Sequence, residues 1–510
     1  MIRKLLGGVL ALALASPAQA QAPTATVTID TSKPGARIER AIYGQFVEHL
    51  GTGIYGGIWV GENSKIPNIK GYRKDVVDAL KHINVPVMRW PGGCFADLYD
   101  WRDGIGPREK RPTRINVHWG GVTDDNAFGT HEFMDFAELI GAEPYVSINV
   151  GSLAPYDSAQ WVEYMTSSEN ATLANERRKN GRDKPWQLKY LGIGNETWGC
   201  GGHMTADVAA DVNARYSTFV NAPREMGMIK VASGASGNRN DYNEYTEAMM
   251  KHGGRLQALS FHYYAMNNGR PKGPATGFGE DKWAEELALT LRMEGFVTET
   301  SAVMDKYDPE KKVALYVDEW GSWYDQEPGS KEGFLYQQNS LRDAQVAALS
   351  LNIFHRHTDR VKMANIAQMV NVLQAMILTD GDRMLRTPTY HVFDMYQPFM
   401  EAVPYPAQVK GPTYSFGKHS MAMVDVSAAR AKDGKTVLAL VNSDPNKSAR
   451  VLTNLTGTAK GQILTAQTMD AHNTFDAPNR LSPTPYGGKT EGGKLAFDLP
   501  AKSVAVVTLD

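Results

Sequence analysis

Two acidic residues, Glu196 and Glu319, each follow a short apolar run and lie close to a Trp and a Gly. The runs, Leu188–Ile193 and Lys312–Val317, have the length of buried strands. Most glycosidases use two opposed carboxylates, one as acid and one as nucleophile or base. Acidic residues also cap helices after strands, so either stretch alone also fits a structural role. The presence of both favours a glycosidase pair.

Eight strand-like runs alternate with helical patterns between residues 38 and 396. The expected strands are Ile42–Val47, Val85–Trp90, Pro144–Asn149, Leu188–Ile193, Ile229–Ser233, Ala258–His262, Val313–Val317 and Val361–Ile366. The expected helices include Tyr72–His82, His131–Gly141, Ala206–Glu225, Trp283–Leu291 and Ser340–His355. This alternation predicts an α/β fold, a (β/α)8 TIM barrel, although periodicity alone also fits an open doubly wound sheet. In such a barrel both carboxylates lie at the catalytic face, where the strands end.

The remaining parts of the chain differ in texture. Residues 397–510 hold short β-rich segments separated by turn residues, as in TVLALVNS, GQILTAQTM, KLAFDLP and SVAVVTLD, which predicts a β-sandwich domain. Residues 21–37 contain an alternating strand that we expect to complete this sandwich. The catalytic barrel is then 38–396, with a Pro-rich linker at Gln397–Gly411.

The first 20 residues have the pattern of a signal peptide. Arg3 and Lys4 precede the apolar run Leu5–Ala15, and small residues follow at Ala18–Ala20. The apolar run is too short to span a bilayer, and no later run reaches 18 apolar residues. We therefore expect an exported, periplasmic or extracellular protein with no membrane partner; the alternative is a retained N-terminal anchor.

Composition excludes some classes of function. The net charge of −2 shows no nucleic-acid footprint. Gly51–Gly56 matches GxGxxG, but no helix pattern follows to hold a pyrophosphate. His131 and Glu132 are followed by Asp135 instead of a second His, so the zinc-protease motif is absent. No cofactor and no metal are expected.

The chain has two cysteines, Cys94 and Cys200, each at an expected strand end near the catalytic face. Two cysteines do not make a disulfide framework. Either one disulfide or two thiols fits the sequence, because the distance between their Cα atoms decides which is possible.

Three further residues follow expected strands at the same face. Glu48 either binds sugar hydroxyls or serves as a cap or an Arg partner. Arg89 either pairs with a catalytic carboxylate or joins strands at the barrel floor. Tyr264 either orients the nucleophile or is plain packing.

Several motifs occur in order between Gly44 and Tyr396: YGQFVEHLG, GIWVGENSKIPN, GYRKDVVDALK, RWPGGCFADLYDWRDGIGP, FGTHEF, YLGIGNETWGCGG, VDEWG, MANIAQMVNVLQAMILTDG and TPTYHVFDMY. They resemble glycoside hydrolase family 51, the α-L-arabinofuranosidases of a large clan of retaining (β/α)8 glycosidases. The C-terminal region resembles the family's β-sandwich in position and texture only.

The resemblance implies a role for the residues at the motif positions. Glu196 matches the general acid/base, Glu319 the nucleophile, and Asn195 the residue that bonds the sugar 2-hydroxyl. Tyr264 matches the Tyr after the sixth strand.

Further positions match the sugar-binding part of the same site. Glu48 and Gln368 match hydroxyl ligands. Many members carry Asn where this chain has Cys94, which removes an amide contact, although other members also carry Cys.

These expectations define an exo-acting, retaining α-L-arabinofuranosidase that acts on arabinose-containing hemicellulose or pectin fragments. Trp59, Trp119 and Trp198 are expected to enclose a pocket for one terminal sugar, with Trp119 in contact with substrate. The alternatives are a β-xylosidase or endo-glucanase on the same barrel, or a non-catalytic carbohydrate-binding protein. The resemblance also implies a homo-oligomer.

Overall fold

The computed structural model describes residues 22–267, 269 and 271–510, so the expected signal peptide, residues 1–20, lies outside the described residues. Eight parallel strands close into a barrel, and each pairs with the next in chain order. They are β2 (Gly44–Phe46), β5 (Val87–Trp90), β8 (Glu143–Ile148), β9 (Tyr190–Ile193), β10 (Ile229–Ser236), β11 (Ala258–Ala265), β12 (Ala314–Ser322) and β13 (Val361–Ala367). All eight expected strands are present, and the barrel, not the open sheet, is the fold.

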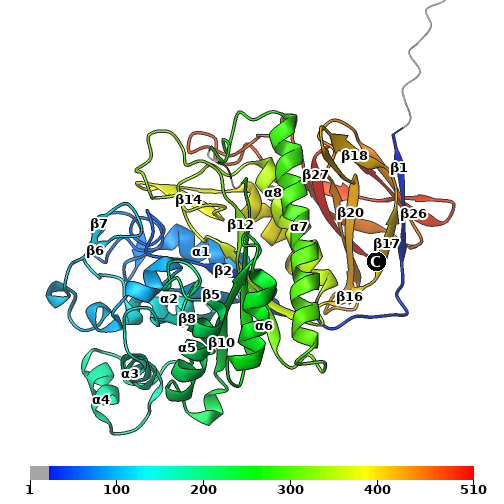
Figure 1. Cartoon of the computed structure of the whole chain (residues 1–510). Coiled ribbons are helices and arrows are strands. Elements are labelled where there is room, and N and C mark those ends of the chain that lie inside the picture. Colours follow the sequence, from blue (N-terminus) through cyan, green and yellow to red (C-terminus); the bar gives the residue numbers. More distant parts are fainter. Residues whose placement is uncertain (1–21, 268, 270) are drawn as a thin grey trace, which may run out of the picture.

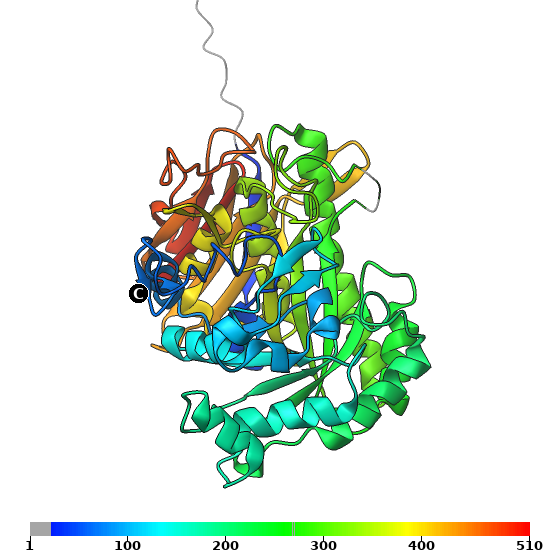
Figure 2. The ribbon, with the colours of Figure 1, turned by 90° about the vertical axis from the view of Figure 1, so that its left-hand side faces the viewer.

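Helices surround the barrel (Figures 1 and 2). They are α1 (Lys74–His82), α2 (Thr130–Ile140), α3 (Pro155–Thr166), α4 (Thr172–Lys179), α5 (Ala206–Phe219), α6 (Tyr242–His252), α7 (Glu280–Asp305), α8 (Leu341–Arg356) and α9 (Pro388–Met395). Helix α5 ends before the expected Glu225, because Pro223 cannot continue it. Helix α7 is much longer than expected. None of the described helices is long and apolar enough to cross a membrane.

An irregularity in β12 turns two adjacent acidic residues toward the site. Ser260 of β11 lies opposite Tyr316 of β12, and His262 lies opposite Glu319. Between these two pairs β11 has one residue and β12 has two. Such a bulge breaks the alternation of side chains between the two faces of a strand. Asp318 and Glu319 can therefore both contact the same partners, although they are neighbours in sequence.

The C-terminal region forms two packed sheets. One has the order β17-β1-β22-β26-β25 and the other β16-β20-β21-β27-β23-β24. The strands are β1 (Thr24–Ile29), β16 (Val403–Tyr405), β17 (Ala407–Lys410), β20 (Val424–Arg430), β21 (Thr436–Asn442), β22 (Ala449–Thr453), β23 (Ala459–Leu464), β24 (Thr484–Gly487), β25 (Lys489–Glu491), β26 (Lys494–Leu499) and β27 (Ser503–Leu509). This confirms the expected β-sandwich.

Strand β1 lies among strands from the other end of the chain, as the blue strand beside orange and red ones shows in Figure 1. It runs parallel to β22 and antiparallel to β17. Ala25, Val27 and Ile29 alternate with exposed residues and point into the sandwich core. The exact domain boundaries at 37/38 and 396/397 stay predictions.

Helices α7 and α8 connect the barrel to the sandwich. Trp283 donates its indole N–H to the Ser443 carbonyl at 2.9 Å. Asn352 donates its amide to Asp425 of β20 at 2.7 Å. Both helices therefore bury one side against the barrel strands and another against the sandwich.

Candidate active site

The two carboxylates named first from the sequence lie together at the C-terminal ends of the barrel strands. Glu196 follows β9 with a left-handed backbone (φ 42°), and Glu319 lies within β12. An oxygen of Glu196, an oxygen of Glu319 and a ring nitrogen of His262 all lie within 4.8 Å of one another. A left-handed non-glycine residue costs about 1–3 kcal/mol and is concentrated at functional sites.

His262, at the end of β11, lies among three carboxylates. Its Nδ1 is 2.9 Å from Glu196 Oε1 and 3.4 Å from Glu319 Oε2, and its Nε2 is 3.3 Å from Asp318 Oδ1. Burial alone would lower the pKa of His262, but Glu319, Asp318 and Glu196 outweigh it and raise that pKa to about 10. The side chain is therefore an imidazolium at neutral pH. Sequence reasoning missed this role, because it singled out Tyr264, two residues further along the chain.

Arg89, at the end of β5, holds the opposite side of Glu319. Its guanidinium donates to Glu319 Oε2 at 3.0 Å and to Asn195 Oδ1 at 2.5 Å, and lies 3.7 Å from Asp318 Oδ2. The side chain is 1% exposed. Of the two roles considered, the structure shows pairing with the carboxylates. The charges of Arg89 and His262 outweigh burial and keep the pKa of Asp318 below its usual value.

Tyr264 places the remaining oxygen of Glu319. Its hydroxyl donates to Glu319 Oε1 at 2.7 Å. Burial and the charge of Glu319 raise the pKa of Tyr264, so its hydroxyl keeps the proton that it donates. Glu319 is thus held from two sides by hydrogen bonds, one to each carboxylate oxygen.

The pKa of Glu196 is shifted in the direction that suits an acid. Burial raises it first of all, and the nearby charge of Glu319 adds to this, while His262 acts against both. One carboxyl group held by hydrogen-bond donors and a second one buried with a raised pKa is the arrangement expected of a nucleophile paired with an acid.

Glu48 lies at the end of the first barrel strand with Gln368 and Trp119. Its Oε1 accepts from the Trp119 indole at 2.7 Å and from the Phe95 amide at 3.0 Å. Gln368 donates to Glu48 Oε2 at 3.3 Å and accepts from the Glu48 amide at 3.2 Å. Burial raises the pKa of Glu48 to about 7. The structure therefore brings these three expected sugar ligands into one group.

The double glycine of the PGG motif makes room for this carboxylate. A Cβ on Gly93 would lie 2.5 Å from Glu48 Oε2, and one on Gly92 would lie 2.7 Å from Glu48 Cγ. Contacts below 3 Å are not tolerated, so any side chain here would displace Glu48. The two glycines therefore leave the space that the Glu48 side chain fills.

Asp97, which sequence reasoning missed, ties the loops behind the site together. Its Oδ1 accepts from the amides of Val150 and Gly151 at 2.8 and 3.0 Å. Its Oδ2 accepts from the Asn195 amide at 2.9 Å. A residue of the loop after β5 thus fixes the loops after β8 and β9, and with them Asn195, whose side chain reaches Arg89.

The loops after β5 and β9 are also joined covalently. Cys94 and Cys200 form a disulfide, with their Cα atoms 5.4 Å apart. Sulfur atoms of both residues lie within 4.8 Å of an oxygen of Glu196. Cys94 thus lies beside the site, but a disulfide sulfur does not replace the amide donor that an Asn would supply there.

The three expected pocket aromatics do not share one place. Trp59 is 4% exposed and packs edge-on against Tyr72, so it belongs to the core, not to a pocket wall. Trp198 is half-buried two residues after Glu196. Trp323, which the sequence did not single out, packs edge-on against Tyr264, with the two ring centroids 5.1 Å apart. The aromatic surroundings of the site are therefore Trp119, Trp198 and Trp323.

Two groups in the described residues have the spacing of metal ligands: Glu196 with His262 and Glu319, and Glu196 with Cys94 and Cys200. In the first, an imidazolium has no nitrogen lone pair to offer a metal. In the second, disulfide sulfurs are not thiolates, which are the form that binds metals. The chemistry of both donor sets is thus that of charge pairing and cross-linking.

Family models match much of the chain. The model described as "Alpha-L-arabinofuranosidase 1 domain" matches residues 79–272, and the one described as "Alpha-L-arabinofuranosidase C-terminal domain" matches residues 318–503. The two matches together include Glu196 and Glu319.

Individual relatives agree with the family models. The chain is 49% identical over 492 residues to a Bacteroides ovatus protein named "Intracellular exo-alpha-L-arabinofuranosidase", covering 95% of each chain. The GH51 arabinofuranosidase structure from Xanthomonas axonopodis pv. citri is 52% identical, with a TM-score of 0.94 over 96% of this chain and 100% of that one. The Thermotoga maritima α-L-arabinofuranosidase in an arabinose complex is 28% identical, with a TM-score of 0.82 over 96% and 99%.

One expectation fails in this comparison. The Bacteroides ovatus relative is described as intracellular, so the prediction that this chain is exported is wrong. A charged start, an apolar run and small residues are a pattern of composition, and composition alone does not make a segment an export signal. The family models and the relatives show that the chain belongs to glycoside hydrolase family 51, the α-L-arabinofuranosidases, and its motifs, barrel and paired carboxylates agree with this.

Proposed function

We propose that this protein is a retaining α-L-arabinofuranosidase in which Glu319 is the nucleophile and Glu196 the general acid/base. The proximity of the two carboxyl groups carries the proposal. Retaining glycosidases hold theirs about 5–5.5 Å apart, whereas inverting ones leave about 6.5–9.5 Å for a water molecule. Oxygens of Glu196 and Glu319 within 4.8 Å of each other fit the first class.

In the first step Glu319 attacks the anomeric carbon while Glu196 protonates the departing glycosidic oxygen. Arg89 and Tyr264 orient the Glu319 carboxylate by hydrogen bonds to its two oxygens. Glu196, whose pKa is raised, supplies the proton. The glycosidic bond breaks, an ester bond to Glu319 forms, and the aglycone leaves as an alcohol.

In the second step Glu196 acts as the base, because Glu319 has lost its negative charge. Esterified Glu319 is neutral, so it no longer raises the pKa of Glu196, which is then ionised and faces the imidazolium of His262 at 2.9 Å. Glu196 takes a proton from water, water attacks the anomeric carbon, and Glu319 is released. Two inversions at the same carbon give net retention, with no external cofactor consumed.

Binding of the sugar hydroxyls is assigned to the groups around these carboxylates. Asn195, Glu48 and Gln368 present polar atoms from the ends of three different strands or loops. Trp119 holds Glu48 through its indole N–H and borders the same space. Cys94 offers only apolar sulfur contact. The Bacteroides ovatus relative is described as exo-acting, which supports removal of single terminal arabinofuranosyl groups from a glycan.

A substrate panel tests the activity. Hydrolysis of nitrophenyl α-L-arabinofuranoside well above that of the β-D-xyloside and of β-glucan is expected; a preference for either of the latter would favour a β-xylosidase or an endo-glucanase. No turnover of any of them would favour a non-catalytic carbohydrate-binding protein. With a branched arabinoxylan, free arabinose is expected, and release of oligosaccharides would contradict exo action.

We also propose that the protein is a homo-oligomer, which the family resemblance supports. Light scattering coupled to gel filtration tests this: a mass that is a multiple of 56.1 kDa agrees with it, and a monomer mass contradicts it.

A further inference from the structure

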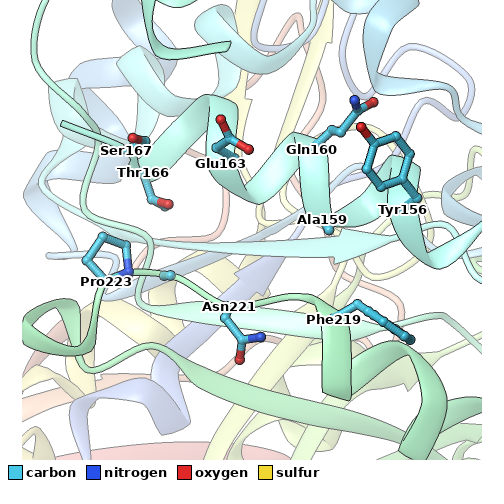
Figure 3. Close-up of a pocket in the computed structure, with 10 residues that line it drawn as sticks. Tyr156, Ala159, Gln160, Glu163, Thr166, Ser167, Phe219, Asn221 and Pro223 are labelled. Carbon is cyan, nitrogen blue, oxygen red and sulfur yellow. The ribbon is translucent and has the colours of Figure 1, made fainter. Parts of the chain in front are cut away.

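Helix α3 and the end of α5 border a hollow on the outside of the barrel (Figure 3). Its volume is about 400 Å³. Tyr156 and Phe219 lie at one end of it, from opposite sides, and are 71% and 56% exposed. These are the two most exposed aromatic side chains in the described part of the chain. Gln160, Glu163 and Asn221 add polar groups to the walls.

A second hollow adjoins the first, because Asn221, Ala222 and Pro223 line both. Its volume is about 1160 Å³. It extends to Ile229 and Ala314, the first residues of β10 and β12. The barrel strands are parallel and the catalytic carboxylates lie at their C-terminal ends, so this hollow lies at the opposite end of the barrel.

The second hollow is strongly positive. Arg224, Lys230, Arg255 and Lys312 line it, and none of its lining residues is acidic. Lys312 pairs with Glu310 outside the lining, and Lys230 donates to a backbone carbonyl and to Asn221. The exposed guanidinium groups of Arg224 and Arg255 have no ion pair or hydrogen bond among the described residues. We call the two hollows together the α3–α5 groove.

We propose that the α3–α5 groove is a second, non-catalytic glycan-binding site that takes a chain bearing uronic acids. Sugar rings have an apolar face of C–H groups that packs on exposed aromatic rings, as Tyr156 and Phe219 offer. Uronate carboxylates match the two-pronged donors of the free arginines. The inference rests on the proposed function, because arabinofuranosyl groups occur on hemicelluloses and pectins whose other sugars include uronic acids.

The position of the groove separates its role from catalysis. A chain bound in the groove lies on the outside of the barrel and at the N-terminal ends of its strands, so it leaves the site around Glu196 and Glu319 open. It would hold the enzyme on an acidic polysaccharide while terminal groups of the same material reach the active site. Binding here should therefore change the action on polymers and leave the hydrolysis of small substrates unchanged.

Calorimetric titration with oligogalacturonate, which has no arabinose, tests the groove without engaging the active site. A neutral xylo-oligosaccharide of equal length is the comparison. Arg224→Gln with Arg255→Gln should weaken oligogalacturonate binding about tenfold or more, because each substitution removes charge-assisted hydrogen bonds to a uronate, which contribute strongly to the binding free energy. Tyr156→Ala with Phe219→Ala should weaken it about three- to tenfold. Arg430→Gln with Arg480→Gln removes the same charge from exposed positions of the C-terminal sandwich domain, on β20 and in the loop between β23 and β24, and should leave binding unchanged.

Three results would overturn the proposal. One is equal affinity for the neutral and acidic oligosaccharides. Another is an equal loss in the sandwich control, which would mean that net charge and not the groove attracts the ligand. The third is a changed mass in light scattering for the groove variants, which would make the groove a contact between copies of the chain. Turnover of nitrophenyl arabinofuranoside by the same variants reports separately on the proposed function.

Discussion

Replacement of His262 by Gln should move the pH profile of the enzyme toward higher pH. The imidazolium donates to Glu196 Oε1 at 2.9 Å and lowers the pKa of that carboxyl. A hydrogen bond to a charged group is worth about 1.5–3 kcal/mol. At 1.36 kcal/mol per pKa unit, its loss raises the pKa of Glu196 by about 1–2 units. The acid form then persists to higher pH.

The assay is kcat/KM for nitrophenyl arabinofuranoside across pH, whose basic limb reports loss of the proton from the free enzyme's acid. That limb should move up by about 1–2 pH units in His262→Gln. Tyr145→Phe is the matched control, because it removes a 2.6 Å hydrogen bond to Asp318 and leaves His262 in place. An unmoved basic limb in His262→Gln, or an equal shift in the control, would refute the reasoning.

The same imidazolium has a consequence for stability. Its pKa is raised from 6.5 to about 10 in the folded protein. The stabilisation it gives is therefore fully present below about pH 6.5 and is lost as pH rises through 10. Unfolding by urea across this range should show a falling free energy for the wild type and a flatter curve for His262→Gln. Parallel curves for the two proteins would contradict the ionised state of His262.

Three further changes have expected outcomes. Asp97→Asn should lower the free energy of unfolding by about 1–3 kcal/mol, because an amide N–H2 would face backbone donors, and kcat should fall with it. A wild-type stability in urea together with unchanged kinetics would contradict this. Trp119→Phe removes the 2.7 Å donor to Glu48 and should raise KM about fivefold with little change in kcat. Reduction of the Cys94–Cys200 disulfide should cost about 2–4 kcal/mol of stability and leave most of the activity, because Asp97 still joins the loops; inactivation at unchanged stability would contradict it.

The sequence predicted the barrel because each strand is a short apolar run closed by polar residues. It predicted α7 poorly, as a helix over 283–291 instead of Glu280–Asp305. This helix packs against α6 and α8 and also touches the C-terminal hairpin at β19 (His419–Ala422), so its buried residues do not form a single stripe. The strand expected through Met469 ends at Leu464.

The candidate site was predictable where a motif marks it and not where three-dimensional packing decides. Glu196 and Glu319 each follow an expected strand, and this position predicts them as a catalytic pair. The inward turn of Asp318 depends on a bulge that alternation of residues does not reveal. The sequence predicts Trp59 as a pocket residue, because a Trp in a Gly-rich loop gives no sign of whether it is buried. Asp97 acts through backbone amides, which leave no mark in the sequence.

The stereochemistry of azide rescue tests the roles of the two carboxylates most directly. Glu196→Ala, with a substrate that has a good leaving group, should still form the ester on Glu319, and added azide should then give a glycosyl azide of retained configuration. Glu319→Ala should lose nearly all activity, and any azide product should have inverted configuration, because azide attacks where the nucleophile stood. Nuclear magnetic resonance of the two products distinguishes them. Inverted product from Glu196→Ala and retained product from Glu319→Ala would reverse the assignment, and near-wild-type rates in both variants would place the active site elsewhere.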